Sequence, residues 1–555
     1  MGKVVNLGIA PRDFLTGDVP NLTRTFIVLL VSFASILFSR AQAATITARS
    51  VSFTDVASAV GLAKDGDLVV VPAGTAGWTS TLTLAKGIQL EGAGNNATVI
   101  LDNIPRTTGG GAVPIISGKF TATQSFRLTG FTFRYGSVTT ATDGSIVLSG
   151  TSQGIRVDHC HFDQLYTGHN VELFGCLYGV IDHCVFDIRN GIGGGTTATA
   201  LVTHANWGNN VSGWGSWADP PYFGTEKFIF FEDNVINNLS PAPNGGSIDA
   251  AHGGRYVARY NTFNNSNLFY HGSDTGSGGA YIRGTRAVEI YNNTFHTNHP
   301  AHSAGQDRGG PLIWHDNNYT GTYTGGMALK VYRVFQGGVV KSGAWGAANG
   351  VSPWDCNVTE PDGTHVDGHA PYLFATGQHV GANDSKVVTV SGQPWKSNQW
   401  VGYSVTNTNS ASPYFSGCDW IISNTANTLT LAPYNDPPYP KFNTGDTFAI
   451  HKVLIALDQP GRGKGDLLKG NPVGTTNLTG TPWPAWLHQA LEPCYSWKNT
   501  LNGSNLNFST SGQNTLRENI DYYNATPMPG YTPYKYPHPL TGPAPPSNLA
   551  IVSGP

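Results

Sequence analysis

The sequence predicts an all-β solenoid, in which similar coils stack along one axis. A short phrase recurs along the chain: an alternating strand, an Asn near the strand end, and an aromatic or aliphatic residue two positions later, as in residues 288–295. Seven copies are 29, 24, 50, 27, 32 and 24 residues apart, which is the period of a coil with one double step. They end at Phe133, Phe162, Phe186, Ile236, Phe263, Phe295 and Tyr319. The 69 Gly, 34 Pro and only 12% charged residues fit such a turn-rich chain.

Equivalent positions of the phrase carry the same kind of residue. Because one coil cannot bury its own apolar edge, apolar residues must recur at the same place and stack on their neighbours. One apolar column contains Val288, Ile229 and Leu312, and a second contains Ile290, Ile181, Val157, Phe231 and Trp314. A polar column contains Asn234, Asn261, Asn293, Asn317 and Asn499. Cys160 and Cys184 fill this polar column in two coils, which predicts buried thiols rather than a disulfide.

These columns resemble the right-handed parallel β-helix of the pectate-lyase-like superfamily, which has an asparagine ladder at the short turn between its second and third sheets. The run formed by residues 66–74, 86–94 and 98–100 resembles the opening coil of many such proteins. The resemblance covers roughly residues 50–340 and 485–525. It implies the fold and says little about the reaction, because function depends on the site that a fold carries.

The chain divides into five predicted parts. Residues 1–43 are predicted to be a signal peptide with a long leader, since the apolar stretch 26–38 follows Arg24 and precedes an A-x-A cleavage site ending at Ala43. A retained N-terminal anchor is the alternative. Residues 44–344 are assigned to the parallel β-helix, with opening coils to about 125, and 345–452 to a small inserted β-domain of short alternating strands. The β-helix resumes over 453–536, and 537–555 is a Pro/Gly/Ser-rich tail that we expect to be disordered.

Composition excludes two classes of partner. The formal charge is −3 and Lys or Arg residues form no run, so we expect no nucleic-acid partner. No stretch after the signal is apolar enough to span a membrane. We expect a secreted monomer. Of the six Cys, Cys356 and Cys418 lie in the insertion and could form a disulfide in an oxidising compartment.

The candidate site lies on the strand that precedes each phrase, which lines the substrate cleft in polysaccharide lyases of the resembled superfamily. Polar residues collect there in the middle of the stack, and a loop over residues 267–279 should overhang the same face. The predicted catalytic residues are Arg283, Arg308, His252 and His271. The predicted substrate-binding residues are Glu172, His204, Asp249, Asp274, Arg286, Trp214 and Trp217.

These residue types suit β-elimination on a uronate polysaccharide. Arg grips a carboxylate bidentately, so Arg283 and Arg308 are expected to bind the uronate or act as base. His252 and His271 are expected to transfer protons. The Arg-x-Pro-x-x-Arg motif of typical pectate lyases is absent. Calcium is the one possible cofactor, with Asp249, Asp274 and Asp307 as candidate ligands that fall short of the six or more oxygens it requires.

Several alternatives remain open at this stage. Arg283 could instead pair with Glu289, and the Trp-rich loop around Trp214 could be a small packed core rather than a sugar-stacking platform. An outward column of changing charge is expected to be a solvated face; it contains Asp158, Asp182, Glu232, Arg259, Tyr291 and His315. The protein as a whole could be a noncatalytic carbohydrate-binding or adhesin-like β-helix. It could also be a glycoside hydrolase, although Glu172 and Asp249 come from coils too far apart to favour that reaction.

Overall fold

The computed structural model describes most of the chain from residue 43 onward. The described ranges are 43–107, 112–189, 197–204, 214–239, 245–271, 283–330, 373–401, 403–431, 440–451, 458–463, 490–510 and 516–542. The predicted signal sequence before Ala43, the loop residue Asp274 and the cysteine Cys356 lie outside them. Among the helices of these ranges, none combines the length and apolarity that crossing a membrane requires.

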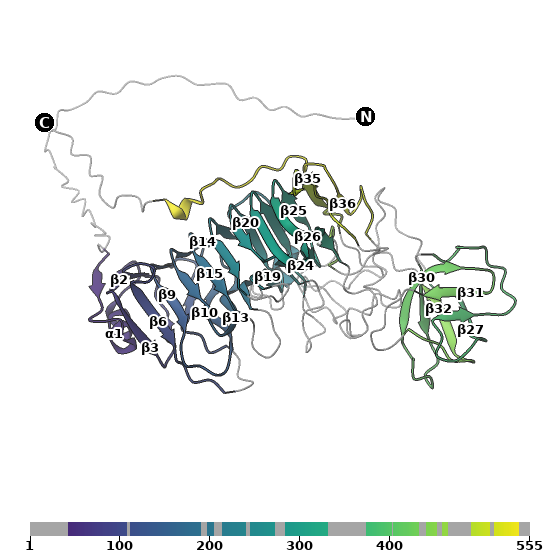
Figure 1. The fold of residues 1–555 in the computed structure, drawn as a ribbon, viewed down its shortest axis with the longest axis horizontal. Helices are drawn as coiled ribbons and strands as arrows, with labels where there is room; N and C mark the ends of the chain where they lie inside the picture. Colours follow the sequence, from purple (N-terminus) through teal and green to yellow (C-terminus); the bar gives the residue numbers. More distant parts are fainter. Residues whose placement is uncertain are drawn as a thin grey trace, which may run out of the picture. The chain divides into compact units, whose positions relative to one another are not determined.

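Three parallel sheets form the body of the protein (Figure 1). Sheet A consists of β1 (Thr45–Thr47), β2 (Leu68–Val71), β5 (Gln89–Gly92), β8 (Ser125–Thr129), β11 (Gly154–Asp158), β14 (Gly179–Asp182), β17 (Ile229–Glu232), β20 (Arg255–Arg259), β23 (Ala287–Tyr291), β25 (Leu312–His315), β33 (Cys494–Trp497) and β36 (Tyr522–Tyr523). Sheet B consists of β3 (Gly74–Trp78), β6 (Thr98–Asp102), β9 (Thr132–Tyr135), β12 (His161–Asp163), β15 (Val185–Ile188), β18 (Val235–Asn238), β21 (Thr262–Asn264), β24 (Thr294–Asp307), β26 (Asn318–Leu329), β34 (Thr500–Leu501) and the antiparallel β35 (Ser504–Asn505). Sheet C consists of β4 (Leu82–Leu84), β7 (Ile116–Phe120), β10 (Thr142–Gly150), β13 (Thr167–Gly175), β16 (Ala198–Thr203) and β19 (Ile248–Ala251).

From β4 to β21, each coil contributes one strand to each sheet in the order C, A, B. The coil β10, β11, β12 is followed by β13, β14, β15, and each strand pairs in parallel with its equivalent one coil later. The fold is therefore a right-handed parallel β-helix, as the sequence predicts. The short helix α1 (Phe53–Leu62), begun by the Ser52 side chain accepting from the Asp55 N–H, packs Val56 and Val60 against the opening coils.

The predicted apolar columns are confirmed as the core of the coils. Val157 pairs in register with Ile181, which pairs with Phe231, and all three are fully buried. Rings stack in the same way on sheet B, where Phe162 and Phe186 have centroids 4.7 Å apart. Burial of each such side chain contributes about 1.5–3 kcal/mol, so the repetition of one residue type stabilises the whole stack.

The asparagine ladder is confirmed as well. The backbone N–H of each ladder residue donates to the Oδ1 of the next, at 3.0 Å from Asn234 to Asn261 and 3.0 Å from Asn261 to Asn293. The Cys184 N–H donates to Asn234 Oδ1 at 2.9 Å, which puts the cysteine at the next ladder position. Cys160 and Cys184 are buried free thiols, as expected.

A small antiparallel sheet is inserted into the β-helix. Its strands are β27 (Leu373–Gln378), β32 (Thr447–His451), β29 (Ser404–Asn407), β30 (Cys418–Asn424), β31 (Thr428–Leu431) and β28 (Val387–Thr389). It has its own apolar core, which includes Val405, Ile421 and Phe448. The β-helix then resumes, because β33 pairs in parallel with β25. The limits given above for each part stay predictions.

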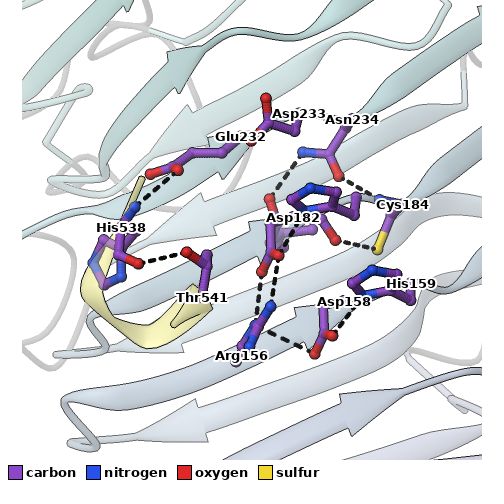
Figure 2. Close-up of polar contacts among 12 residues, drawn as sticks. Arg156, Asp158, His159, Asp182, Cys184, Glu232, Asp233, Asn234, His538 and Thr541 are labelled. Carbon is purple, nitrogen blue, oxygen red and sulfur yellow. Dashed lines mark hydrogen bonds and ion pairs between the residues drawn. The ribbon is translucent and has the colours of Figure 1, made fainter. Parts of the chain in front are cut away.

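The outward charged column is not a solvated face, and that expectation is wrong. Asp158, Asp182, Glu232 and Arg259 are all fully buried. Residues 531–541, which we name the C-terminal strap and which include the 3-10 helix η3 (Pro539–Thr541), lie over them on sheet A (Figure 2). The expectation of a disordered tail is accordingly wrong for residues 537–542.

Backbone groups of the strap take part in holding it on sheet A. Arg259 donates to the carbonyl oxygens of Tyr534 and Lys535, and Arg156 donates to that of Leu540. The backbone N–H of His538 donates to Glu232 at 3.1 Å. The charged side chains of this column therefore bind the C-terminal strap instead of facing solvent.

Candidate functional site

The outer face of sheet C is longer than its six strands. The two-residue strand β22 (Leu268–Phe269) extends it, since the Phe269 N–H donates to Ser247 Oγ and Leu268 pairs with Gly305. The later parts of β24 and β26 follow, with Asp307 opposite Leu329. The sequence analysis predicts that a polysaccharide binds on this extended face.

Alternation along these strands decides which residues point outward. On β13, Val171 and Leu173 face the core, so Glu172 faces out, and it aligns with Leu201 on β16 and Asp249 on β19. Tyr270 and Asp307 are fully buried, so their neighbours His271 and Arg308 are placed on the outer side. Lys330 follows in register beside Arg308. The polar residues gathered on the extended face are His169, Glu172, Asp249, His252, His271, Arg308 and Lys330.

One end of the face carries a histidine–carboxylate pair. His169 Nδ1 lies 2.9 Å from Glu172 Oε1, and the Glu172 side chain is 3% exposed. Burial by itself lowers the pKa of His169, but the hydrogen bond to Glu172 and the charges of Glu172 and Asp249 outweigh it and raise the pKa. A side chain on Gly144 would meet the Glu172 carboxyl at 2.7 Å, so the glycine makes room for this pair.

The centre carries a second pair. His271 Nδ1 lies 2.9 and 2.8 Å from the two carboxylate oxygens of Asp249, which fixes the ring and leaves Nε2 on the other side. The side chains are 27% and 12% exposed. His252 is close by: burial and the charge of His271 lower its pKa, and Asp249 opposes the shift.

The other end is basic. The Phe269 ring contacts both the His271 ring, at 5.1 Å between centroids, and the Arg308 guanidinium, at 4.1 Å. Burial lowers the pKa of Lys330, and the charge of Arg308 lowers it further. Carboxylates, imidazoles and cations thus follow one another along a single face.

Four predicted site residues are buried away from this face, and their assignment to direct substrate contact is wrong in this structure. Arg283 is fully buried and forms an ion pair with Asp458, which comes from beyond the insertion. Its predicted alternative partner, Glu289, bonds to other groups. Arg286 is also buried and pairs with Glu492.

The other two are a histidine and a tryptophan. His204 is 1% exposed, its Nε2 lies 3.1 Å from the Leu177 oxygen, and burial lowers its pKa to about 3. Trp217, on helix α2 (Trp214–Ala218), is fully buried, and its Nε1–H donates to the Gly284 oxygen at 2.8 Å. The Arg283 guanidinium lies 4.4 Å from its ring. Trp217 therefore belongs to a packed cluster rather than a sugar-stacking platform, while the Trp214 side chain lies outside the described part.

The described residues fit calcium poorly. Asp307 is buried inside the coil, where burial raises its pKa well above the usual range and favours the neutral acid. Asp249 does lie on the face, but both of its oxygens contact His271. A calcium ion needs six or more oxygen ligands, and the described part of the face does not assemble them.

Sequence reasoning missed His169, Phe269 and Lys330. His169 precedes Glu172 by three residues on β13, so strict alternation would put it on the core side with Val171 and Leu173, and only its contact with Glu172 in the structure reveals it. Phe269 and Lys330 gave no signal in the sequence, because they belong to this face only once β22, β24 and β26 extend it.

Comparisons with known proteins add little. No protein-family model matches the chain, and neither does any curated protein sequence. A solved structure of an alginate lyase from Paenibacillus sp. str. FPU-7 is similar over 51% of this chain and 99% of that one, with 15% identity and a TM-score of 0.30. A solved structure of ORF18 of Geobacillus virus E2 is similar over 50% of this chain and 52% of that one, with 13% identity and a TM-score of 0.25. With TM-scores this low, neither similarity bears on the reaction.

Proposed function

We propose that this protein is a secreted, monomeric polysaccharide lyase that cleaves an acidic, uronate-containing polysaccharide by β-elimination. The observation that carries the proposal is the pairing of His271 with Asp249 next to Arg308 and Lys330 on the outer face of sheet C. The described strands of this face follow one another along the stack, an arrangement that suits a long chain better than a small molecule.

The residues divide the reaction between them. Arg308 binds the uronate carboxylate and withdraws negative charge, which acidifies the C5 proton. A base takes that proton, the C5 electron pair forms the C4=C5 double bond, and the C4–O bond breaks with a proton delivered to the leaving oxygen. His271, held by Asp249, and Lys330, whose pKa is lowered, are the two groups suited to these proton transfers. His252, which lies near this pair, is a further candidate for proton transfer.

The test is ultraviolet absorbance of the unsaturated product on a panel of uronate polysaccharides, with and without calcium. His271→Ala, Arg308→Ala and Lys330→Ala should each lower kcat/KM by roughly a hundredfold or more. His183→Ala is the matched control, because His183 is a half-exposed histidine on a turn of the same solenoid outside this face. Full activity in all three variants would refute the assignment.

A glycoside hydrolase is the second candidate. The structure places the two candidate carboxylates closer together than the sequence analysis expected. Glu172 and Asp249 have only one strand between them, so their Cα atoms lie roughly 10 Å apart, a spacing from which carboxyl groups on one face can reach the separation used by inverting glycosidases. New reducing ends without an unsaturated product, abolished by Glu172→Gln, would establish this reaction. Saturable polysaccharide binding with neither product would establish the noncatalytic binding protein.

A further inference from the structure

Two neighbouring coils repeat an Asp-His-Cys sequence that the proposed site does not use. Residues 158–163 and 182–187 both follow the pattern Asp-His-Cys-x-Phe-Asp, with His161 at the variable position of the first and Val185 at that of the second. The coils pair in register, so Asp163 lies opposite Asp187 on sheet B. The repeat creates two groups of carboxylates and imidazoles, one on each side of the ladder turn.

The first group is already neutralised by arginine. Arg127 donates to both oxygens of Asp158, at 2.7 Å each, and Arg156 donates to both oxygens of Asp182, at 2.9 and 2.8 Å. Figure 2 shows Arg156 reaching both carboxylates. Two carboxylates face two guanidiniums, so this group has no net negative charge left to bind a further cation.

The second group lacks that balance. Asp163 is paired with Arg134, but the partners of Asp187 are His161 Nε2, at 2.8 Å, and the neutral Asn237 amide, at 2.8 Å. In the described ranges, no Lys or Arg forms an ion pair with Asp187. The side chains of His161, Asp163 and Asp187 are only 16%, 15% and 22% exposed, so water screens the two facing carboxylates incompletely.

We propose that His161, Asp163 and Asp187 form a binding site for a first-row divalent transition-metal ion, with Zn²⁺ as the representative. One ligand atom from each lies within 4.8 Å of the others. Tetrahedral zinc with bonds of about 2.0–2.2 Å needs ligand atoms about 3.4 Å apart, a change that side-chain torsions supply. The imidazole nitrogen selects against Ca²⁺ and Mg²⁺, which prefer oxygen alone.

The ion replaces the His161–Asp187 hydrogen bond by two metal–ligand bonds and adds Asp163 as the third ligand. It joins β12 to β15, so it connects two successive coils. The site is on sheet B and is independent of the proposed reaction on sheet C. Because only the folded stack brings the two coils together, bound Zn²⁺ must stabilise the folded protein.

The test is calorimetric titration of the full folded protein with Zn²⁺, together with its thermal midpoint and the visible absorption of a Co²⁺ complex. Wild type should bind one equivalent that both His161→Ala and Asp187→Asn weaken by roughly tenfold or more. His159→Ala is the matched control, since His159 belongs to the arginine-neutralised group one turn away, and it should keep this equivalent.

Each outcome decides the matter. Tenfold or greater weakening of this equivalent in both variants, with a smaller Zn²⁺-dependent thermal shift measured against each variant's own metal-free midpoint, supports the site. Binding that survives both substitutions places the ion elsewhere and overturns the proposal, as does the absence of saturable binding in wild type. Equal loss in His159→Ala would show that the two groups do not differ and would overturn the charge argument.

Discussion

The glutamate beneath the C-terminal strap makes the strongest quantitative prediction. Glu289 accepts hydrogen bonds from Tyr531 Oη and, at 2.8 Å, from the Gly224 N–H. Burial raises its pKa from 4.5 to about 7, although the bonds from Tyr531 and Gly224 oppose the shift. Between these two values the folded protein keeps a proton that the unfolded chain has lost. Stability is therefore fullest below about pH 4.5 and falls as the pH rises through about 7.

The size of the effect follows from the shift. A difference of about 2.5 pKa units corresponds to about 3 kcal/mol, most of which is lost between about pH 5 and pH 8. Glu289→Gln cannot titrate, so the variant should lose that much less stability than wild type over the same interval. Burying the glutamine amide lowers the free energy of unfolding of the variant by the same amount at both pH values, so it does not change the pH-dependent loss.

Urea unfolding of both proteins at the two pH values measures the difference. Other titrating groups are common to both proteins and cancel. Glu226→Gln, an exposed carboxylate that precedes β17 two coils earlier, is the control and should behave as wild type. If Glu289→Gln and wild type lose the same free energy of unfolding, the burial argument for Glu289 is refuted.

The remaining predictions concern the strap, the ladder and the cleft. Arg259→Met removes the donor to Tyr534 and Lys535 and leaves Glu232 buried without its cation. The free energy of unfolding should therefore fall by about 3–5 kcal/mol, and limited proteolysis should release the strap. A strap that stays resistant to the protease would contradict this prediction. Asn261→Ala leaves the Asn234 N–H unsatisfied and should cost about 1–3 kcal/mol in urea unfolding, whereas Asn264→Ala, a half-buried asparagine on the same coil, should cost less. Gly144→Ala pushes against the Glu172 carboxyl and should weaken polysaccharide binding at that end of the face without unfolding the protein, as judged by equilibrium binding and circular dichroism; unchanged affinity would remove Glu172 from the site.

The fold was predictable because its causes are local and repeated. A coil of about 24 to 32 residues must stack the same residue type at the same place, so the columns and the Asn ladder are visible in the sequence. The outward positions of Glu172 and Asp249 were predictable in the same way, since alternation within a strand decides which side a residue faces.

The errors came from segments distant in sequence. Arg283 has the residue type of a carboxylate binder, but Asp458, 175 residues later, buries it in an ion pair. The column from Asp158 to His315 has the pattern of a solvated face, but a strap that starts more than 200 residues after His315 covers it. Periodicity reports which side of a sheet a residue faces and not what comes to lie on that side.

The sequence by itself therefore determined the solenoid, its core and the residue types available to each face. Only the tertiary structure decided which outward charges reach solvent, and it also extended sheet C far enough to bring Lys330 beside Arg308. The physical reason is that core stacking is a contact between neighbouring coils of similar sequence. Covering a face, by contrast, is a contact between segments that share no pattern.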